Sequence, residues 1–356
     1  MLKIIVSTFL YSLFLLQTFN ACAIECNNNK VRILSINGGG VRGIIPSIVL
    51  TDIESKLNGK SIAESFDIIT GTSTGAIIAL ALNVPDPNNK NKPKYKSNDI
   101  VNLYKDFNSN VFDTTFRRKF FSMNGWLSYK YNSKPLNKLL KKYLGETKIS
   151  ESISNLVIPA YDVKNNKTEI FNTRQARLFP EKHDYRMWEV ALAATAAPTY
   201  FKSFKINNRE FIDGGLTMNN PTLASMIHAF MLCGRRVDFF ILSIGTGRTK
   251  IENLVGSSGK LGWLKHILNI TIDGVSQLNH KQVQLVISEL NKDRKDNKYV
   301  YLDIVIDKEN ELLDNTSTQN IQKLEEYGNY LIKKESQEIK NIVSIIMKSY
   351  SLLEQE

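Results

Sequence analysis

A serine framed by two glycines is the first residue of this sequence that could do chemistry. Residues 71–75, Gly-Thr-Ser-Thr-Gly, have the form G-x-S-x-G and lie between an apolar run typical of a strand (66–70) and one typical of a buried helix (75–84). A nucleophile on a sharp strand-to-helix turn needs small neighbours, because its strained backbone is crowded by adjacent chain. The helix N-terminus also favours negative charge near the serine. The pattern predicts that Ser73 is a nucleophile, with Gly71 and Gly75 supporting its turn.

A serine hydroxyl needs a general base to become a nucleophile. His228, His266 and His280 come late enough in the chain to complete a triad in the order Ser, acid, His. Each of them lies in a helix-like segment with no turn to present it, and a packed helix residue is the simpler interpretation for His228. The histidines therefore give no clear base.

Asp213 has the setting that the histidines lack. The stretch FIDGG ends a predicted strand on this acid, and Gly214 and Gly215 follow directly. Asp-Gly is also a common turn sequence, so the pattern alone leaves the role of Asp213 open.

A glycine-rich loop follows the first predicted strand (31–36). Gly38, Gly40 and Gly43 fit the dinucleotide-binding pattern G-x-G-x-x-G, and a helical stretch follows them. Ribose recognition needs an acidic residue at the end of a second strand, about 20 residues on, whereas Asp67 begins its strand. A glycine run that leads into a helix can equally present backbone N–H groups to another anion.

The three glycine-containing elements occur in a fixed order, 38–43, then 71–75, then 213–215. This set resembles the patatin-like phospholipase family, which uses a Ser–Asp dyad in place of a Ser–His–Asp triad. Asn37 departs from the pattern, because many members carry Asp before the glycines, but it precedes the loop and is not part of the dyad. The resemblance extends over most of the chain through four further segments, 131–150, 192–201, 219–225 and 242–247.

The resemblance implies an α/β fold with three layers, a mostly parallel central sheet flanked by helices, and a Ser–Asp dyad. Ser73 is then the nucleophile and Asp213 the proton acceptor. Backbone N–H groups of Gly38, Gly39 and Gly40 form the oxyanion hole, so the glycines hold an oxyanion and not a dinucleotide. The implied supporting residues are Arg42, Gly43, Gly71, Gly75, Gly214 and Gly215.

Two details of this site are open to test. Arg42 either braces the glycine loop or meets lipid phosphate. A carboxylate with a reference pKa near 3.9 is a weak base at neutral pH, so we expect burial to raise the pKa of Asp213.

The resemblance also implies the activity, a lipid acyl hydrolase of the phospholipase A or lysophospholipase type that needs no calcium and no cofactor. Its substrate is a phospholipid or another fatty acyl ester. Two alternatives use the same fold: a non-specific esterase or acyltransferase on the same Ser–Asp site, and a storage or lipid-binding protein. Whether a partner activates the protein stays open.

Composition and charge set broad limits. The chain has 356 residues, 42% hydrophobic and 23% charged, and we expect one domain over residues 30–350. The formal net charge is +11, but Lys is spread along the chain, which favours a solvated surface or weak attraction to anionic lipid over nucleic acid.

Residues 116–135 interleave aromatic and basic side chains, which is typical of either membrane-surface contact or a packed cap. No spacing typical of metal ligands is present in the sequence.

The first 23 residues predict export. Lys3 precedes an apolar stretch (4–19), and Ala-Cys-Ala at 21–23 has the form of a signal-peptidase site. The alternatives are an uncleaved membrane anchor and a lipoprotein acylated on Cys22. After removal of residues 1–23, Cys26 and Cys233 remain, which is no disulfide framework, and we expect Cys233 to be an ordinary buried helix residue.

The remaining elements follow from hydrophobic patterning. Residues 84–99 predict an exposed loop without periodicity, 100–147 helical segments, and 187–201 a helix that ends at Pro198. The tail from 315 to 356 predicts amphipathic helix. Further strands are expected at 155–163, 168–173, 209–215 and 238–247.

Overall fold

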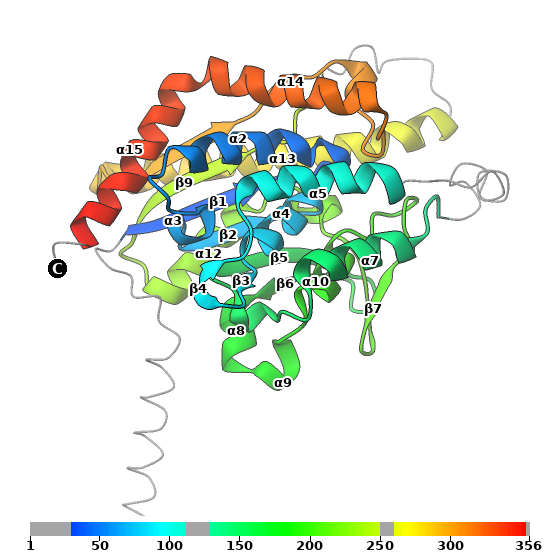
Figure 1. Ribbon diagram of the computed structural model, residues 1–356, viewed down its shortest axis with the longest axis horizontal. Helices are drawn as coiled ribbons and strands as arrows, with labels where there is room; N and C mark the ends of the chain where they lie inside the picture. The colour runs from blue at the N-terminus through cyan, green and yellow to red at the C-terminus, as the bar shows by residue number, and fades with distance from the viewer. Residues whose placement is uncertain (1–29, 112–128, 250–259, 354–356) are drawn as a thin grey trace, which may run out of the picture.

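A computed structural model describes residues 30–111, 129–249 and 260–353, with α13 described by its backbone alone over 260–270. The predicted signal peptide and residues 116–128 of the aromatic and basic segment lie outside these ranges. An eight-stranded sheet crosses the molecule (Figure 1). Its strands are β1 (Lys30–Ile36), β2 (Ile68–Gly71), β5 (Asn155–Asp162), β6 (Lys167–Asn172), β7 (Phe204–Ile206), β8 (Arg209–Asp213), β9 (Asp238–Ile244) and β10 (Lys298–Leu302).

The strand order is β10-β9-β1-β2-β5-β8-β7, with β6 also paired to β5. The five strands from β10 to β5 are parallel, whereas β6, β7 and β8 pair antiparallel. Ile36 pairs with Gly71 at the ends of β1 and β2, so the loops after these two strands leave the same edge of the sheet. The end of β8 reaches β5 where Asp213 pairs with Ala160. The predicted mostly parallel α/β fold is confirmed.

Helices cover both faces of the sheet because successive apolar side chains of its strands point to opposite sides. In β1, Leu34 and Ile36 join one core, whereas Val31 and Ile33 join the other. The first core includes residues of α2 (Ile44–Ser55), α4 (Thr74–Leu82), α5 (Ser97–Asn110), α7 (Ser133–Leu144), α10 (Met187–Ala194), α14 (Thr318–Lys334) and α15 (Ser336–Leu353). The second core includes residues of α12 (Thr222–Cys233) and α13 (Lys260–Asp293), so the molecule has three layers.

Short elements complete the described chain. None of the described helices is both long and apolar enough to cross a membrane. The short elements are η2 (Gly40–Gly43), α3 (Ile62–Ser65), β3 (Pro85–Asp86), β4 (Asn89–Pro93), η4 (Ile149–Glu151), α8 (Thr173–Leu178), α9 (Pro180–His183), α11 (Gly215–Met218) and η5 (Lys308–Asn310).

Two predicted boundaries were wrong. Part of the expected loop at 84–99 forms the hairpin β3–β4, whose polar strand β4 is mostly exposed and so carries no apolar alternation. Helix α10 ends at Ala194 and not at Pro198, because Pro198 has no N–H to donate to the Ala194 carbonyl oxygen. The prediction of amphipathic helix in the C-terminal tail is confirmed, as two helices that are separated at Glu335.

Cys233 also differs from its prediction. It lies half-buried at the end of α12 and is disulfide-bonded, so it is not an ordinary buried thiol. Its partner lies outside the described residues. The apolar helix around Cys233 suggested burial, but Gly234 ends that helix with a φ of 78°, and the exposed Met231 and Gly234 show that its last turn lies near the surface.

Candidate active site

Ser73 occupies a strained turn between β2 and α4. Its φ is 52°, in the left-handed region that a residue with a Cβ rarely adopts. The flanking glycines allow the close packing of this turn: a Cβ on Gly71 would lie 2.1 Å from the Gly75 carbonyl oxygen, and a Cβ on Gly75 would lie 2.3 Å from that of Ile36. The predicted elbow geometry is confirmed, and it leaves the Ser73 side chain partly exposed at the N-terminus of α4.

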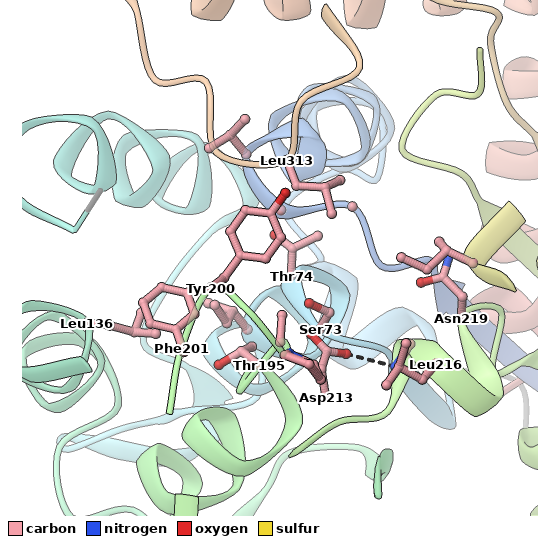
Figure 2. Close-up of a pocket in the computed structure, with 18 of the residues that line it drawn as sticks. Ser73, Thr74, Leu136, Thr195, Tyr200, Phe201, Asp213, Leu216, Asn219 and Leu313 are labelled. Atoms are coloured by element: carbon pink, nitrogen blue, oxygen red, sulfur yellow. Dashed lines mark hydrogen bonds between the residues drawn. The ribbon is translucent and has the colours of Figure 1, made fainter. Parts of the chain in front are cut away.

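Asp213 lies at the end of β8 beside Ser73 (Figure 2). The side chain is buried, and the Gly215 N–H donates a hydrogen bond of 2.8 Å to its Oδ1. Burial raises the pKa of Asp213 from 3.8 to about 6, although hydrogen bonds from the Ser73 side chain and the Gly215 backbone favour the charged form. The predicted rise in pKa is confirmed. At neutral pH this carboxylate is a stronger base than an exposed one, and it lies next to the serine hydroxyl.

Gly214 lets the end of β8 approach the backbone of its neighbour β5 closely. A Cβ on this residue would lie 2.5 Å from the Pro159 carbonyl oxygen of β5. Together with the pairing of Asp213 and Ala160, this contact fixes the carboxylate at the edge where β2 ends.

The backbone N–H groups of Gly38, Gly39 and Gly40 differ in their hydrogen bonds. The Gly38 N–H donates to the Asn219 carbonyl oxygen at 3.2 Å. The N–H groups of Gly39 and Gly40 have no acceptor among the described residues, and both glycines line a pocket together with Ser73. The three glycines were predicted as equivalent donors, but an oxyanion beside Ser73 would find Gly39 and Gly40 ready, whereas Gly38 would first have to release or share its bond.

Arg42 lies behind the glycine loop. Its side chain is buried, and its Nε donates to the Gly39 carbonyl oxygen at 3.4 Å. Burial lowers the pKa of Arg42, while the carboxylates of Asp273 and Asp303 act in the opposite direction. Of the two predicted roles, the geometry favours bracing of the loop, because a contact with lipid phosphate needs an exposed guanidinium.

Two neighbours of the loop complete this arrangement. Gly43 leaves room for Tyr104, since a Cβ on the glycine would lie 2.2 Å from the tyrosine hydroxyl. Asn37 is buried on the same side as Arg42, where its Nδ2 donates to the Tyr301 hydroxyl at 3.4 Å. Asn37 does not line the pocket of Ser73, which agrees with the small effect expected of this departure from the family pattern.

The pocket beside Ser73 and Asp213 has mostly apolar walls. Leu136 and Phe201 lie on one side of the dyad in Figure 2, whereas Tyr200 and Leu313 lie across the opening above it. Several of these residues lie in the segments 131–150 and 192–201, which the family resemblance includes, whereas no pattern in the sequence marked Leu313. The apolar lining consists of Val41, Ile77, Tyr104, Leu136, Ala197, Pro198, Tyr200, Phe201, Leu216, Ile272 and Leu313.

Two of the three histidines are far from this chemistry. His228 is buried in α12, where burial lowers its pKa to about 4, and His280 lies in α13 with its Nδ1 2.8 Å from the Tyr299 hydroxyl. Neither lines the pocket. The interpretation of His228 as a packed helix residue is confirmed, and Asp213 is the one carboxylate among the described residues that line the pocket of Ser73. The side chain of His266 lies outside the described residues.

Fold and site together define the class of protein. It is an α/β protein in which a serine elbow, a glycine loop and a buried carboxylate meet at one apolar pocket.

Comparison with known proteins gives the family. Residues 34–226 match the family model of the patatin-like phospholipases. The chain is 32% identical to patatin-like protein 2 of Arabidopsis thaliana over 345 residues, which cover 86% of this chain and 84% of that protein. It is 28% identical to patatin group A-2 of Solanum tuberosum, over 85% of this chain and 84% of the relative. The chain belongs to the patatin-like phospholipase family, a family of lipid acyl hydrolases.

Among solved structures, VipD from Legionella pneumophila matches 84% of this chain and 67% of its own length. Its sequence identity is 12% and the TM-score is 0.34, which is too weak to add to the assignment.

Proposed function

We propose that the protein is a calcium-independent phospholipase A or lysophospholipase in which Ser73 is the nucleophile and Asp213 the general base. One observation carries the proposal: Ser73, strained on its elbow, lies beside a buried carboxylate of raised pKa in a pocket with apolar walls. In the described residues, no group of three or more His, Cys, Asp and Glu side chains could hold a metal ion. The dyad and the glycine loop supply the base, the nucleophile and the oxyanion donors of acyl transfer.

The reaction has two halves. The Ser73 oxygen attacks the ester carbonyl carbon while its proton passes to the Asp213 carboxylate. The carbonyl oxygen becomes an oxyanion that accepts hydrogen bonds from the Gly39 and Gly40 N–H groups, and from Gly38 if its bond to Asn219 is exchanged. The tetrahedral intermediate expels the alkoxide, which takes the proton from Asp213. Water then attacks the carbonyl carbon of the acyl-enzyme while its proton passes to Asp213. The bond between the Ser73 oxygen and the acyl carbon breaks, Ser73 takes the proton back from Asp213, and the fatty acid leaves.

The pocket lining supports a fatty acyl substrate. Its walls offer aliphatic and aromatic side chains to an acyl chain, and burial of each CH₂ group stabilises a complex by about 0.8 kcal/mol. A non-specific esterase or acyltransferase would use the same dyad and remains the second candidate. A storage or lipid-binding role is less well supported, because both reactive groups are present and lie next to each other.

We infer that the protein is exported and acts at a membrane surface. Disulfides persist in oxidising compartments, so the disulfide of Cys233 supports export. Without residues 1–23, whose only charged side chain is Lys3, the formal net charge is +10, which attracts anionic lipid. An uncleaved N-terminal anchor and acylation of Cys22 are the alternatives.

The test is release of fatty acid from phosphatidylcholine vesicles in excess chelator. Wild type should release fatty acid, and Ser73→Ala and Asp213→Ala should each lose the activity. Ser225→Ala is the matched control and should retain activity. Ser225 is a fully buried serine of α12, and its Oγ donates to the Pro221 carbonyl oxygen. Retained activity in Asp213→Ala would exclude the dyad, and dependence on calcium would contradict the proposed metal-independent reaction.

A comparison of substrates separates the two enzymatic candidates. A phospholipase should hydrolyse vesicular phosphatidylcholine with a higher kcat/KM than a short-chain nitrophenyl ester. The reverse order would favour a general esterase on the same site.

A further inference from the structure

Thr246 makes a buried contact with the glycine loop that the proposed reaction does not use. It follows β9, only about 4% of its surface is exposed, and its Oγ1 donates a hydrogen bond of 2.7 Å to the Gly38 carbonyl oxygen. The two residues are 208 positions apart in the sequence. The side chain also packs tightly on the next residue, since a Cβ on Gly39 would lie 2.1 Å from Thr246 Oγ1 and 2.5 Å from its Cβ.

This hydrogen bond fixes the orientation of one peptide group. The Gly38 carbonyl and the Gly39 N–H belong to the same planar trans peptide, so they point in opposite directions. When Thr246 holds the carbonyl on its side of the loop, the Gly39 N–H must face the other side. Gly39 lines the pocket of Ser73 there, and its N–H has no acceptor among the described residues.

The following peptide group is held in the same way. The Gly39 carbonyl oxygen accepts hydrogen bonds from the backbone N–H of Arg42 at 3.2 Å and from its Nε at 3.4 Å. The Gly40 N–H, on the same peptide as that carbonyl, therefore faces away from Arg42. Two successive carbonyls are thus hydrogen-bonded on one side of the loop, and the N–H groups of Gly39 and Gly40 on the other side have no acceptor in the described part of the chain.

Thr246 is itself held by its glycine neighbours. The Gly245 N–H donates to the Leu302 carbonyl oxygen at 2.8 Å, and the Gly247 N–H donates to Asp303 Oδ1 at 3.1 Å. Both acceptors lie at or just after the end of β10, which pairs with β9 in the sheet. The hydroxyl is therefore carried by a rigid part of the fold and can set the orientation of the loop.

We propose that Thr246 is a positioning residue that orients the Gly38–Gly39 peptide so that the Gly39 N–H is aimed at the oxyanion formed on Ser73. The inference rests on the proposed acyl transfer and adds a residue to it. Thr246 does not line the pocket of Ser73, so it would act through the peptide that it bonds. A hydrogen bond to the carbonyl also polarises the peptide and strengthens its N–H as a donor.

Two substitutions separate the hydroxyl from the shape of the side chain. Thr246→Val keeps the branched shape and removes the donor, whereas Thr246→Ser keeps the donor and removes the methyl group. Loss of an oxyanion donor elsewhere lowers kcat by about 100- to 1,000-fold, so loss of orientation in Thr246→Val should lower kcat by about 10- to 100-fold. KM for a soluble ester should stay within about threefold, and Thr246→Ser should keep most of the wild-type kcat.

Thr173→Val is the matched control for lost stability. Thr173 is also fully buried, and its Oγ1 accepts a hydrogen bond of 2.9 Å from the Leu156 N–H, away from the glycine loop. The melting temperature of Thr173→Val should fall as that of Thr246→Val does. At a temperature where both variants are folded, the kcat of Thr173→Val should equal that of wild type.

A second readout reports on the oxyanion alone. A fatty trifluoromethyl ketone forms a hemiketal: its carbonyl carbon bonds to the Ser73 oxygen, its oxygen becomes the oxyanion, and the serine proton passes to Asp213. The affinity of Thr246→Val for this ketone should fall by the same factor as its kcat/KM. The affinity of the variant for a fatty alcohol of equal length should not change.

The outcomes are distinct. A folded Thr246→Val with wild-type kcat and ketone affinity would overturn the inference and leave the proposed function intact, as would a Thr246→Ser variant that is as impaired as Thr246→Val. A wild-type protein that shows no Ser73-dependent reaction with esters or with a fluorophosphonate would overturn the proposed function, and this inference with it.

Discussion

The base role proposed for Asp213 places two opposing requirements on its carboxylate: burial makes it a stronger base, but it must be charged to accept a proton. Burial raises its pKa from 3.8 to about 6, while the Ser73 side chain and the Gly215 N–H limit the rise. The result is a carboxylate that is ionised at neutral pH but takes up a proton more readily than an exposed one.

This balance predicts the pH dependence of catalysis. In the proposed reaction only ionised Asp213 accepts the Ser73 proton, so kcat/KM should be half-maximal near pH 6 and fall about tenfold per pH unit below it. A pH–rate profile on a soluble ester, with the fold monitored by circular dichroism, measures this. Full activity of the folded protein at pH 4 would contradict the assignment of Asp213 as the base.

The same pKa predicts a stability effect. The folded carboxyl has a pKa of about 6 and the unfolded one about 3.8, so the folded state binds more protons between these values and stability falls as pH rises through them. At pH 8 the ionised group destabilises the fold by about 3 kcal/mol, at 1.36 kcal/mol per pKa unit. Asp213→Asn should therefore raise the melting temperature at pH 8 and lose this advantage near pH 3.5. An equal gain at both pH values would show that ionisation is not its cause.

At the scale of elements, the serine elbow depends on close packing of the β2–α4 turn against β1. A Cβ on Gly75 would meet the Ile36 carbonyl oxygen at 2.3 Å, and neither backbone segment can move without disturbing the sheet. Gly75→Ala should destabilise the protein by about 1–3 kcal/mol or prevent folding. Thermal melting measures the difference.

Gly274→Ala is the control for this substitution. Gly274 lies within α13, and a Cβ on this residue would meet no atom of the described residues within 4 Å outside the backbone of its own helix, so alanine should stabilise the helix by about 0.5–1 kcal/mol. If Gly75→Ala were tolerated as well as Gly274→Ala, the elbow would not require close backbone approach.

Elements whose sequence carried a local signal were predicted well. Strands β1, β2 and β9 are buried apolar runs, and the glycine motifs follow β1 and β2 directly. Short β7 and polar β4 were missed, because neither has a long apolar run to mark it. The half-exposed β10 is an exception: its sequence KYVYL is a run of aromatic and apolar residues typical of a strand, and it was missed all the same.

The residues of the candidate site follow the same rule: those with a local sequence pattern were predicted, and those that depend on distant contacts were not. Ser73 and Asp213 were found because a strand and small neighbours flank each of them in the sequence. The pocket wall at Leu313 and the Thr246 hydroxyl that bonds the Gly38 carbonyl depend on contacts between distant segments, for which a single sequence gives no pattern.

At the scale of the whole molecule, the disulfide of Cys233 links the proposed export of the protein to a property that can be measured. Lys30, the first described residue, pairs with Asp238, five positions after Cys233. The other two cysteines of the sequence, Cys22 and Cys26, both precede Lys30. Export and processing therefore change the number of thiols in the protein in a way that can be counted.

Removal of residues 1–23 leaves Cys26 and Cys233 alone, so we predict that the exported protein has no titratable thiol before reduction and two after it. An uncleaved chain would show one free thiol when oxidised, and acylation of Cys22 would add the mass of a lipid to the intact protein. Reduction should also lower the melting temperature, because loss of a native disulfide costs about 2–5 kcal/mol. Thiol titration and intact mass measure all three states, with Cys233→Ser as the control that reduction should no longer destabilise. Two free thiols in the exported, unreduced protein would contradict the disulfide and remove the support that it gives to export.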